Sequence, residues 1–149
     1  MRHRWLAVTS VVALSGCGYN TIQTYDEQAN SAKQNIEVQL QRRADLVPNL
    51  VATVRAQAKQ ELDVFTQVAQ ARAGLVGAVQ RGNPAEMANA NEQLTGALRN
   101  LMVTVEAYPQ IKSDQAFLRL QDELAGTENR IAVSRNDYNE AVERYNTYI

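Results

Sequence analysis

Apolar residues recur at alternating spacings of three and four along nearly the whole chain, and this pattern constrains the fold more than any other feature. A first run extends from Ile22 to Leu40 and a second from Val47 to Val79. Such spacing places the apolar side chains on one stripe of a helix, with Gln, Arg, Asp and Glu on the opposite face. No comparable stretch alternates at a period of two, as a half-buried strand would. The sequence therefore predicts an all-α fold.

Two further helices are predicted from the residues that can begin and end them. The clearest boundary is residues 81–86, Arg-Gly-Asn-Pro-Ala-Glu, where the glycine can end one helix and the asparagine and proline can begin the next. We expect this third helix to end at Pro109. Ser113 is the expected cap of a fourth helix that runs to the C-terminus.

Pro48 lies within the second apolar run, where a helix-interior proline would cost about 3 kcal/mol or more. One alternative is a single kinked helix from Asn20 to Gln80, which would be about 90 Å long, too long for the helices after Gly82 to cover. The other is an antiparallel turn from Asp45 to Pro48, which gives four helices of similar length. We therefore predict an antiparallel up-and-down four-helix bundle with a turn at this position.

The N-terminal segment has the layout of a secretory signal peptide that ends at a cysteine. Residues 2–4 are basic, and residues 5–14 form an apolar run that rises only about 15 Å as a helix, roughly half of a hydrocarbon core. The sequence Leu-Ser-Gly-Cys at residues 14–17 resembles the lipobox of bacterial lipoproteins, in which the cysteine is acylated and becomes the first residue of the mature chain. The alternative is an unmodified or buried Cys17. We expect a signal peptide over residues 1–16, lipid attachment and a short tether over residues 17–21, and a helical bundle over residues 22–149.

The residue after the cysteine, Gly18, bears on localisation. In sorted lipoproteins, which this segment resembles, a residue other than aspartate at this position favours the outer membrane. The expected location is therefore the cell envelope, lipid-anchored, on the periplasmic face of the outer membrane if the cell has two membranes. Residues 18–21 can span at most about 14 Å, so the bundle is expected close to the membrane surface.

Composition and charge exclude several classes of function. The formal net charge of -1 gives no indication of nucleic-acid binding. His3 and Cys17 are the single histidine and cysteine, so after cleavage and lipidation the chain would hold neither an imidazole nor a thiol for catalysis or metal binding. We predict no catalytic residue, no metal, no cofactor and no enzymatic activity. An envelope enzyme that uses clusters of Arg, Asp and Glu, or a carrier of a small ligand, remain as alternatives.

Two polar clusters, in residues 39–51 and 127–139, differ from ordinary solvated helix faces. Their side chains can form hydrogen bonds and charge pairs between helices that fix the register of a bundle. The alternative is a surface that recognises a partner protein of the envelope, in which Arg and Tyr are favoured anchors. The candidate residues are Arg42, Arg43, Asp45, Asn49, Glu128, Asn129, Arg130, Arg135 and Tyr138.

Residues 38–51, Val-Gln-Leu-Gln-Arg-Arg-Ala-Asp-Leu-Val-Pro-Asn-Leu-Val, resemble the signature of the LemA family. Tyr108-Pro109, residues 127–132, residues 135–139 and Tyr145-Asn146 resemble the second half of the family pattern. The resemblance implies an antiparallel four-helix bundle that is attached to a membrane by its N-terminus and lies outside the cytoplasm. Members of the family share no agreed enzymatic activity, so the resemblance implies none for this chain.

The chain departs from the family pattern in its N-terminal region and after the proline motif. The short apolar run that ends at Cys17 stands in place of a longer, uncleaved membrane helix. Residues 57–61, Gln-Ala-Lys-Gln-Glu, stand in place of the family's Tyr-Ala-x-His-Glu. We predict a membrane-anchored scaffold or interaction module of the cell envelope, whose partners are the membrane, through lipid on Cys17, and an unidentified envelope protein.

Overall fold

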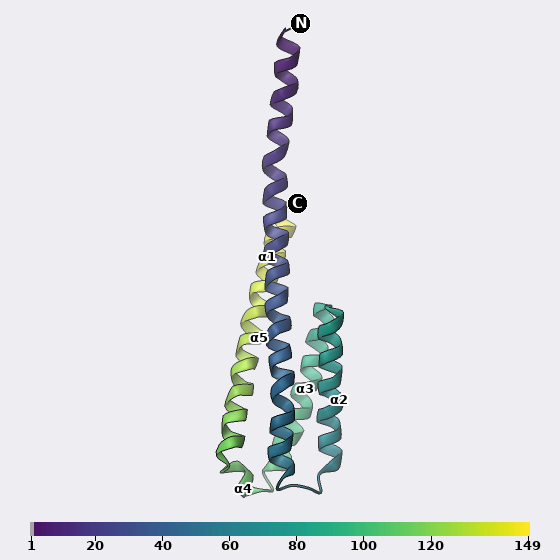
Figure 1. The fold of residues 1–149 in the computed structure, drawn as a ribbon, viewed down its shortest axis with the longest axis vertical. Helices are drawn as coiled ribbons and strands as arrows, with labels where there is room; N and C mark the ends of the chain where they lie inside the picture. Colours follow the sequence, from purple (N-terminus) through teal and green to yellow (C-terminus); the bar gives the residue numbers. More distant parts are fainter. Residues whose placement is uncertain (1) are drawn as a thin grey trace. The chain divides into compact units, whose positions relative to one another are not determined.

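The chain folds entirely into helices over the residues that the computed structural model describes, which are 2–149 for the backbone and 20–149 for the side chains. The helices are α1 (Arg2–Arg55), α2 (Leu62–Arg81), α3 (Pro84–Val105), α4 (Pro109–Lys112) and α5 (Gln115–Tyr148) (Figure 1). The predicted all-α fold class is confirmed. The chain divides into two compact units, one of residues 1–34 with 134–149 and the other of residues 35–133, so α1 and α5 each contribute to both.

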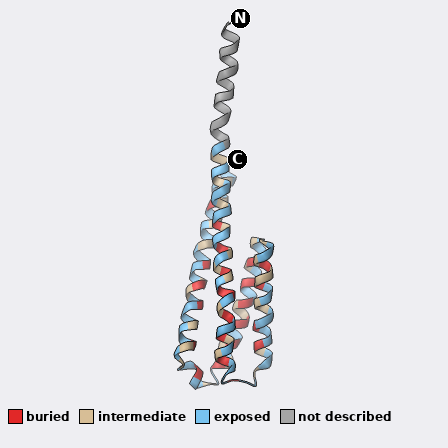
Figure 2. Cartoon of the chain, in the orientation of Figure 1, coloured by how far each residue is buried: buried red, intermediate tan, exposed pale blue. Residues whose placement is uncertain are grey.

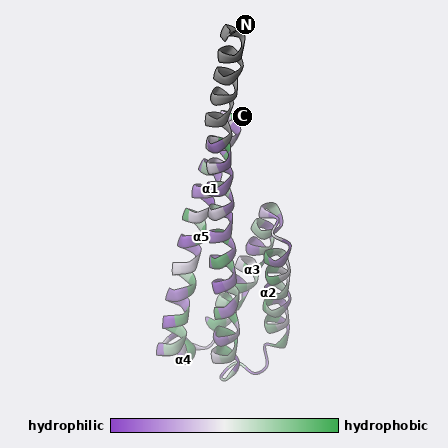
Figure 3. Cartoon of the chain, turned by 45° about the horizontal axis from the view of Figure 1, so that its top comes forward, coloured by the Kyte–Doolittle hydropathy of each residue, from purple (hydrophilic) through white to green (hydrophobic). Residues whose placement is uncertain are grey.

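The unit of residues 35–133 contains most of the buried apolar side chains. In this unit the C-terminal part of α1, then α2, α3 and the N-terminal part of α5 run in alternating directions (Figure 1). Figure 2 shows buried residues recurring along each of these segments, and Figure 3 shows hydrophobic and hydrophilic residues on all of them, as amphipathic helices require. Burial of each large apolar side chain contributes about 1.5–3 kcal/mol to folding. The fully buried apolar ones are Leu40, Val47, Leu50, Val54, Val68, Leu75, Met87, Leu94, Leu101 and Ile111.

In the other unit, residues 20–34 of α1 pair with residues 134–148 of α5. Ala32 and Ala141 are buried there. The rings of Tyr25 and Tyr148 meet edge to face, with centroids 5.5 Å apart and an interplanar angle of 65°, a favourable geometry for two aromatic rings. Among the described side chains of this unit, small buried residues and the contact of Tyr25 with Tyr148 therefore characterise this pair of helix ends.

The predicted turn from Asp45 to Pro48 is wrong, because α1 continues through both residues to Arg55. Pro48 has no N–H, so the carbonyl of Ala44, four residues earlier, lacks its helical donor. Arg72 of α2 donates from Nε to that carbonyl at 2.8 Å and replaces the missing hydrogen bond. The ring of Pro48 lies on the exposed side of the helix and takes no space in the core. The proline is thus accommodated inside a continuous helix.

The chain reverses at residues 56–61 instead. The N–H groups of Gln57 and Ala58 both donate to the carbonyl of Val54 and close α1. Ala58 is only 1% exposed although it lies in the turn. Because a buried alanine continues the apolar spacing between Val54 and Phe65, the spacing does not mark the position of this turn.

The boundary predicted at residues 81–86 is confirmed. Gly82 ends α2 in the left-handed conformation, with φ 67° and ψ 19°, which glycine adopts without steric cost. The side chain of Asn83 accepts hydrogen bonds from the N–H groups of Ala85 at 2.9 Å and Glu86 at 3.2 Å, at the N-terminus of α3. Local residue chemistry alone accounts for this connection.

The predicted cap of the last helix is wrong by one residue. The carboxylate of Asp114 accepts hydrogen bonds from the N–H groups of Ala116 at 2.7 Å and Phe117 at 3.2 Å. The Ser113 hydroxyl instead donates to carbonyls of α4. A carboxylate also interacts favourably with the positive end of the helix dipole, so Asp114 is the N-terminal cap of α5.

Replacing this cap provides a direct test. We expect Asp114→Ala to lower the free energy of unfolding by about 1 kcal/mol, because two N–H groups of the first turn lose their acceptor. Ser113→Ala is the matched control, with an expected change of about 0.5 kcal/mol or less. Thermal unfolding followed by circular dichroism measures both. Equal losses in the two variants would contradict the assignment of the cap.

Several predictions concern the N-terminal segment. The signal peptide over residues 1–16 and the lipidated Cys17 lie outside the residues whose side chains are described, and of the tether over residues 17–21 only Asn20 and Thr21, both in α1, are described. Across the described part of the chain, the structure contains no helical stretch with the length and apolar character needed to cross a bilayer.

Candidate functional site

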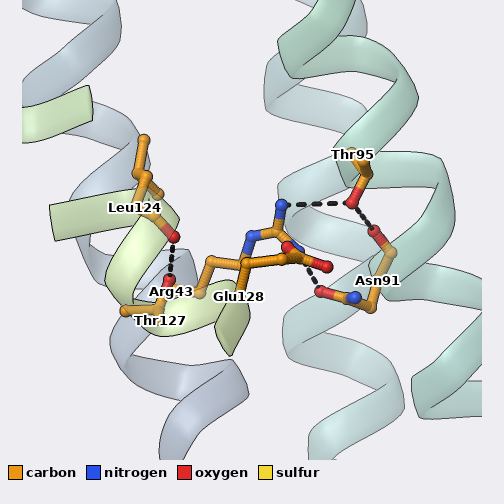
Figure 4. Close-up of polar contacts among 6 residues, drawn as sticks. All are labelled: Arg43, Asn91, Thr95, Leu124, Thr127 and Glu128. Carbon is orange, nitrogen blue, oxygen red and sulfur yellow. Dashed lines mark hydrogen bonds and ion pairs between the residues drawn. The ribbon is translucent and has the colours of Figure 1, made fainter. Parts of the chain in front are cut away.

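Arg43 forms the centre of a polar cluster inside the unit of residues 35–133. Its side chain is 5% exposed. Nη2 donates to the Thr95 hydroxyl at 3.1 Å, and Nη1 donates to the Asn91 side-chain oxygen and forms an ion pair with the Glu128 carboxylate (Figure 4). One guanidinium from α1 is therefore bound by side chains of both α3 and α5. We call these four residues the Arg43 cluster.

The neighbouring turn of α5 is held by its own hydrogen bond. Thr127 is fully buried, and its hydroxyl donates to the Leu124 carbonyl at 2.7 Å (Figure 4). Because a bound hydroxyl can be buried without the cost of an unpaired polar group, Thr127 fits into the apolar stripe of α5 directly before Glu128.

The electrostatics of the Arg43 cluster are set by burial. Burial lowers the pKa of Arg43 below its usual range, while the nearby charge of Glu128 opposes that shift. An arginine stays protonated at neutral pH even so, because its usual pKa is far above neutrality. The Glu128 side chain is 46% exposed, so water still solvates part of its charge. Replacing a buried ion pair with apolar residues is often neutral or stabilising, whereas removing one partner alone is costly.

Of the nine residues named from the sequence, the structure brings Arg43 and Glu128 together. The other seven do not join this pair. Asp45 instead accepts a hydrogen bond from the Gln41 amide at 2.8 Å, and Arg130 donates from Nε to the Gly126 carbonyl at 3.2 Å, each on its own helix. The exposed candidates are Arg42, Asp45, Asn49, Asn129, Arg130 and Arg135, and Tyr138 is half-buried. Arg135 and Tyr138 belong to the other unit.

Sequence reasoning missed Asn91, Thr95 and Arg72. Asn91 and Arg72 could have been found from the sequence, because each is a polar residue at a position where the helix pattern expects an apolar one. Asn91 lies three residues before the buried Leu94, and Arg72 lies three residues before the buried Leu75. A side chain at such a position faces the neighbouring helices, so a polar one there needs a polar partner.

A further polar contact joins the two connections at one end of the same unit. The Tyr108 hydroxyl donates to the Glu61 carboxylate at 3.0 Å. This hydrogen bond, with smaller contributions from burial and from the negative charge of Glu61, raises the pKa of Tyr108 above its usual value of 10.0. The contact ties the turn after α1 to the residues that lead into α4.

Metal binding is not indicated by the described side chains, among which no three His, Cys, Asp or Glu residues gather in a way that could hold an ion. In the Arg43 cluster, one guanidinium binds an amide, a hydroxyl and a carboxylate. Its chemistry is that of a link between three helices.

Comparison with known proteins identifies the family. The model of the LemA family matches residues 32–149, which include the whole Arg43 cluster and the Pro48 segment. The chain is 30% identical to the magnetosome proteins MamQ 1 and MamQ 2 of Paramagnetospirillum magneticum, over alignments of 170 residues that cover 97% of this chain and 61% of each relative. It is 28% identical over 157 residues to the magnetosome protein MamQ of Magnetospirillum gryphiswaldense, covering 88% of this chain and 57% of that protein. The chain spans about three fifths of the length of these relatives. This chain belongs to the LemA family.

Proposed function

We propose that this chain is a non-catalytic scaffold or interaction module that lipid on Cys17 anchors to a membrane of the cell envelope. The observation that carries the scaffold role is the Arg43 cluster. The Arg43 guanidinium of α1 binds side chains of α3 and α5. Groups held in this way fix the arrangement of the helices and leave the outer helix faces to meet a partner.

Membership of the LemA family and the likeness to proteins named for the magnetosome support an association with a membrane or an envelope structure. The attachment itself rests on the Leu-Ser-Gly-Cys sequence at residues 14–17. A lipoprotein-type modification supplies two or three acyl chains on one residue. Each buried methylene contributes about 0.8 kcal/mol, so such an anchor would be durable. The residue after the cysteine, Gly18, favours the outer membrane.

The anchor is tested by labelling and fractionation. We expect the full chain to incorporate an alkyne analogue of palmitate and to stay in the membrane fraction after a high-salt wash. Cys17→Ser should lose the label and accumulate as a precursor of higher mass. Ser10→Ala, in the apolar run before the junction, is the matched control and should behave like the parent chain. Unchanged processing and membrane retention of Cys17→Ser would refute the proposed anchor.

A further inference from the structure

A groove with an apolar floor lies between α1 and α2 beside Pro48. It has a volume of about 390 Å³. Val47, Phe65 and Val68 in its lining are buried, and Val51 is half-buried. The groove thus exposes apolar surface from the part of the family's proline motif that follows Arg43 on α1, and none of its lining residues belongs to the Arg43 cluster.

Two arginines, Arg55 and Arg72, line this groove. They are the charged residues of its lining among the described side chains. The guanidinium of Arg55 lies 5.9 Å from the ring centroid of Phe65, within the range of a cation–π contact. Arg72 is held by the hydrogen bond from its Nε to the Ala44 carbonyl, which leaves its two terminal nitrogens as donors. Both side chains already have contacts within the chain. The loss of side-chain entropy on ligand binding would therefore be small.

The two arginines lie at different heights along the groove. Arg55 contacts Phe65, and Phe65 and Arg72 are seven residues apart on α2, which corresponds to about 10 Å along a helix. Apolar surface from Val51 and Val68 lies between them. A helix with carboxylates at positions i and i+7 and apolar residues at i+3 and i+4 has the complementary pattern on one face.

We propose that this groove docks an acidic amphipathic helix of a partner protein, with its apolar residues on the floor and its carboxylates on Arg55 and Arg72. The proposal rests on the interaction role proposed above and names the chemistry of the partner. The positive charge of the lining is the argument for an acidic occupant, since a groove flanked by cations repels a basic helix and leaves a neutral one without ion pairs.

The test uses the purified full chain in detergent micelles and a fluorescein-labelled, alanine-based helical peptide. The peptide carries Glu at i and i+7 and Leu at i+3 and i+4, and a second peptide has Gln in place of both Glu residues. Fluorescence anisotropy should show saturable binding of the acidic peptide, with the Gln peptide at least about tenfold weaker because two charge-assisted contacts are lost. Binding should also weaken as salt is added.

Variants of the chain locate the binding site. Ala69→Glu places a carboxylate at an exposed position in the groove and should weaken binding at least about tenfold through like-charge repulsion. Arg55→Gln should weaken it several-fold. The matched controls, Ala132→Glu and Arg119→Gln, change exposed residues of α5 and should bind like the parent chain. Thermal unfolding of all four variants checks that the fold is intact.

Three outcomes would overturn the proposal. The first is no saturable binding of the acidic peptide, and the second is equal binding of the Gln peptide or of Ala69→Glu. The third is self-association of the parent chain that Ala69→Glu abolishes, without peptide binding, because a second copy would then occupy the groove. Peptide binding does not depend on acylation, so a failure of the groove and a failure of the Cys17 anchor are distinguishable.

Discussion

Replacing Arg43 with alanine is expected to lower the free energy of unfolding by about 3 kcal/mol. Removal of one member of a buried ion pair costs about 3–5 kcal/mol. The lower end applies here because Glu128, the charge left behind, is 46% exposed and can be solvated. The main loss comes from Asn91, which is 4% exposed and would keep a buried side-chain oxygen without its donor. Urea denaturation of the full chain, followed by circular dichroism, measures the change.

The adjacent residue supplies the matched control. Arg42 has the same side chain one position earlier but is exposed, so Arg42→Ala should change stability by no more than about 0.5 kcal/mol. The triple variant Arg43→Met, Asn91→Leu, Glu128→Leu should regain most of the lost stability, because apolar residues of similar size often replace a buried polar cluster at little cost. Equal losses from Arg42→Ala and Arg43→Ala would contradict the placement of the cluster.

Replacing Pro48 with alanine is expected to raise the free energy of unfolding by about 2 kcal/mol. In a helix interior, proline is about 3 kcal/mol less favourable than alanine. Part of that difference is already offset, because proline restricts the unfolded chain and because Arg72 replaces the missing hydrogen bond to Ala44. Urea denaturation of the full chain again gives the value.

A double-mutant cycle tests whether Arg72 acts through the proline. In the parent chain, Arg72→Met should cost about 1–2 kcal/mol, since the Ala44 carbonyl then loses its donor. With alanine at position 48, a backbone N–H can bind that carbonyl, so the same substitution should cost about 1 kcal/mol less. Strict additivity of the two changes would show that the hydrogen bond does not compensate for the proline.

The sequence predicted the helices because apolar spacing and helix caps are local properties. The boundary at Gly82 and Asn83 depends on residues that contact their own neighbours, and it was predicted correctly. The first turn was predicted at the wrong residues. The hydrogen bond that allows Pro48 inside a helix comes from Arg72 on another helix, 28 residues after Ala44. The buried Ala58 then conceals the true turn by continuing the apolar spacing.

The sequence indicated which types of residue form the candidate site better than it indicated which residues contact one another. Arg43 and Glu128 stood out in two polar segments, but Asn91 lies 48 residues from Arg43, and only the fold brings them into contact. Neighbours such as Arg42 and Asn129 were named with them and are exposed. Consecutive residues of a helix point about 100° apart, so adjacency in sequence does not place two side chains in one cluster.

The hydrogen bond from Arg72 to Ala44 also sets the order in which substitutions can accumulate during evolution. If Arg72 changes first, the carbonyl of Ala44 is left without a donor, whereas a change of Pro48 first restores a backbone donor and removes that constraint. Lineages are therefore expected to lose the proline before the arginine. If the groove docks a partner through Arg72, lineages that have lost the proline should still keep the arginine, because the helix itself would no longer require it.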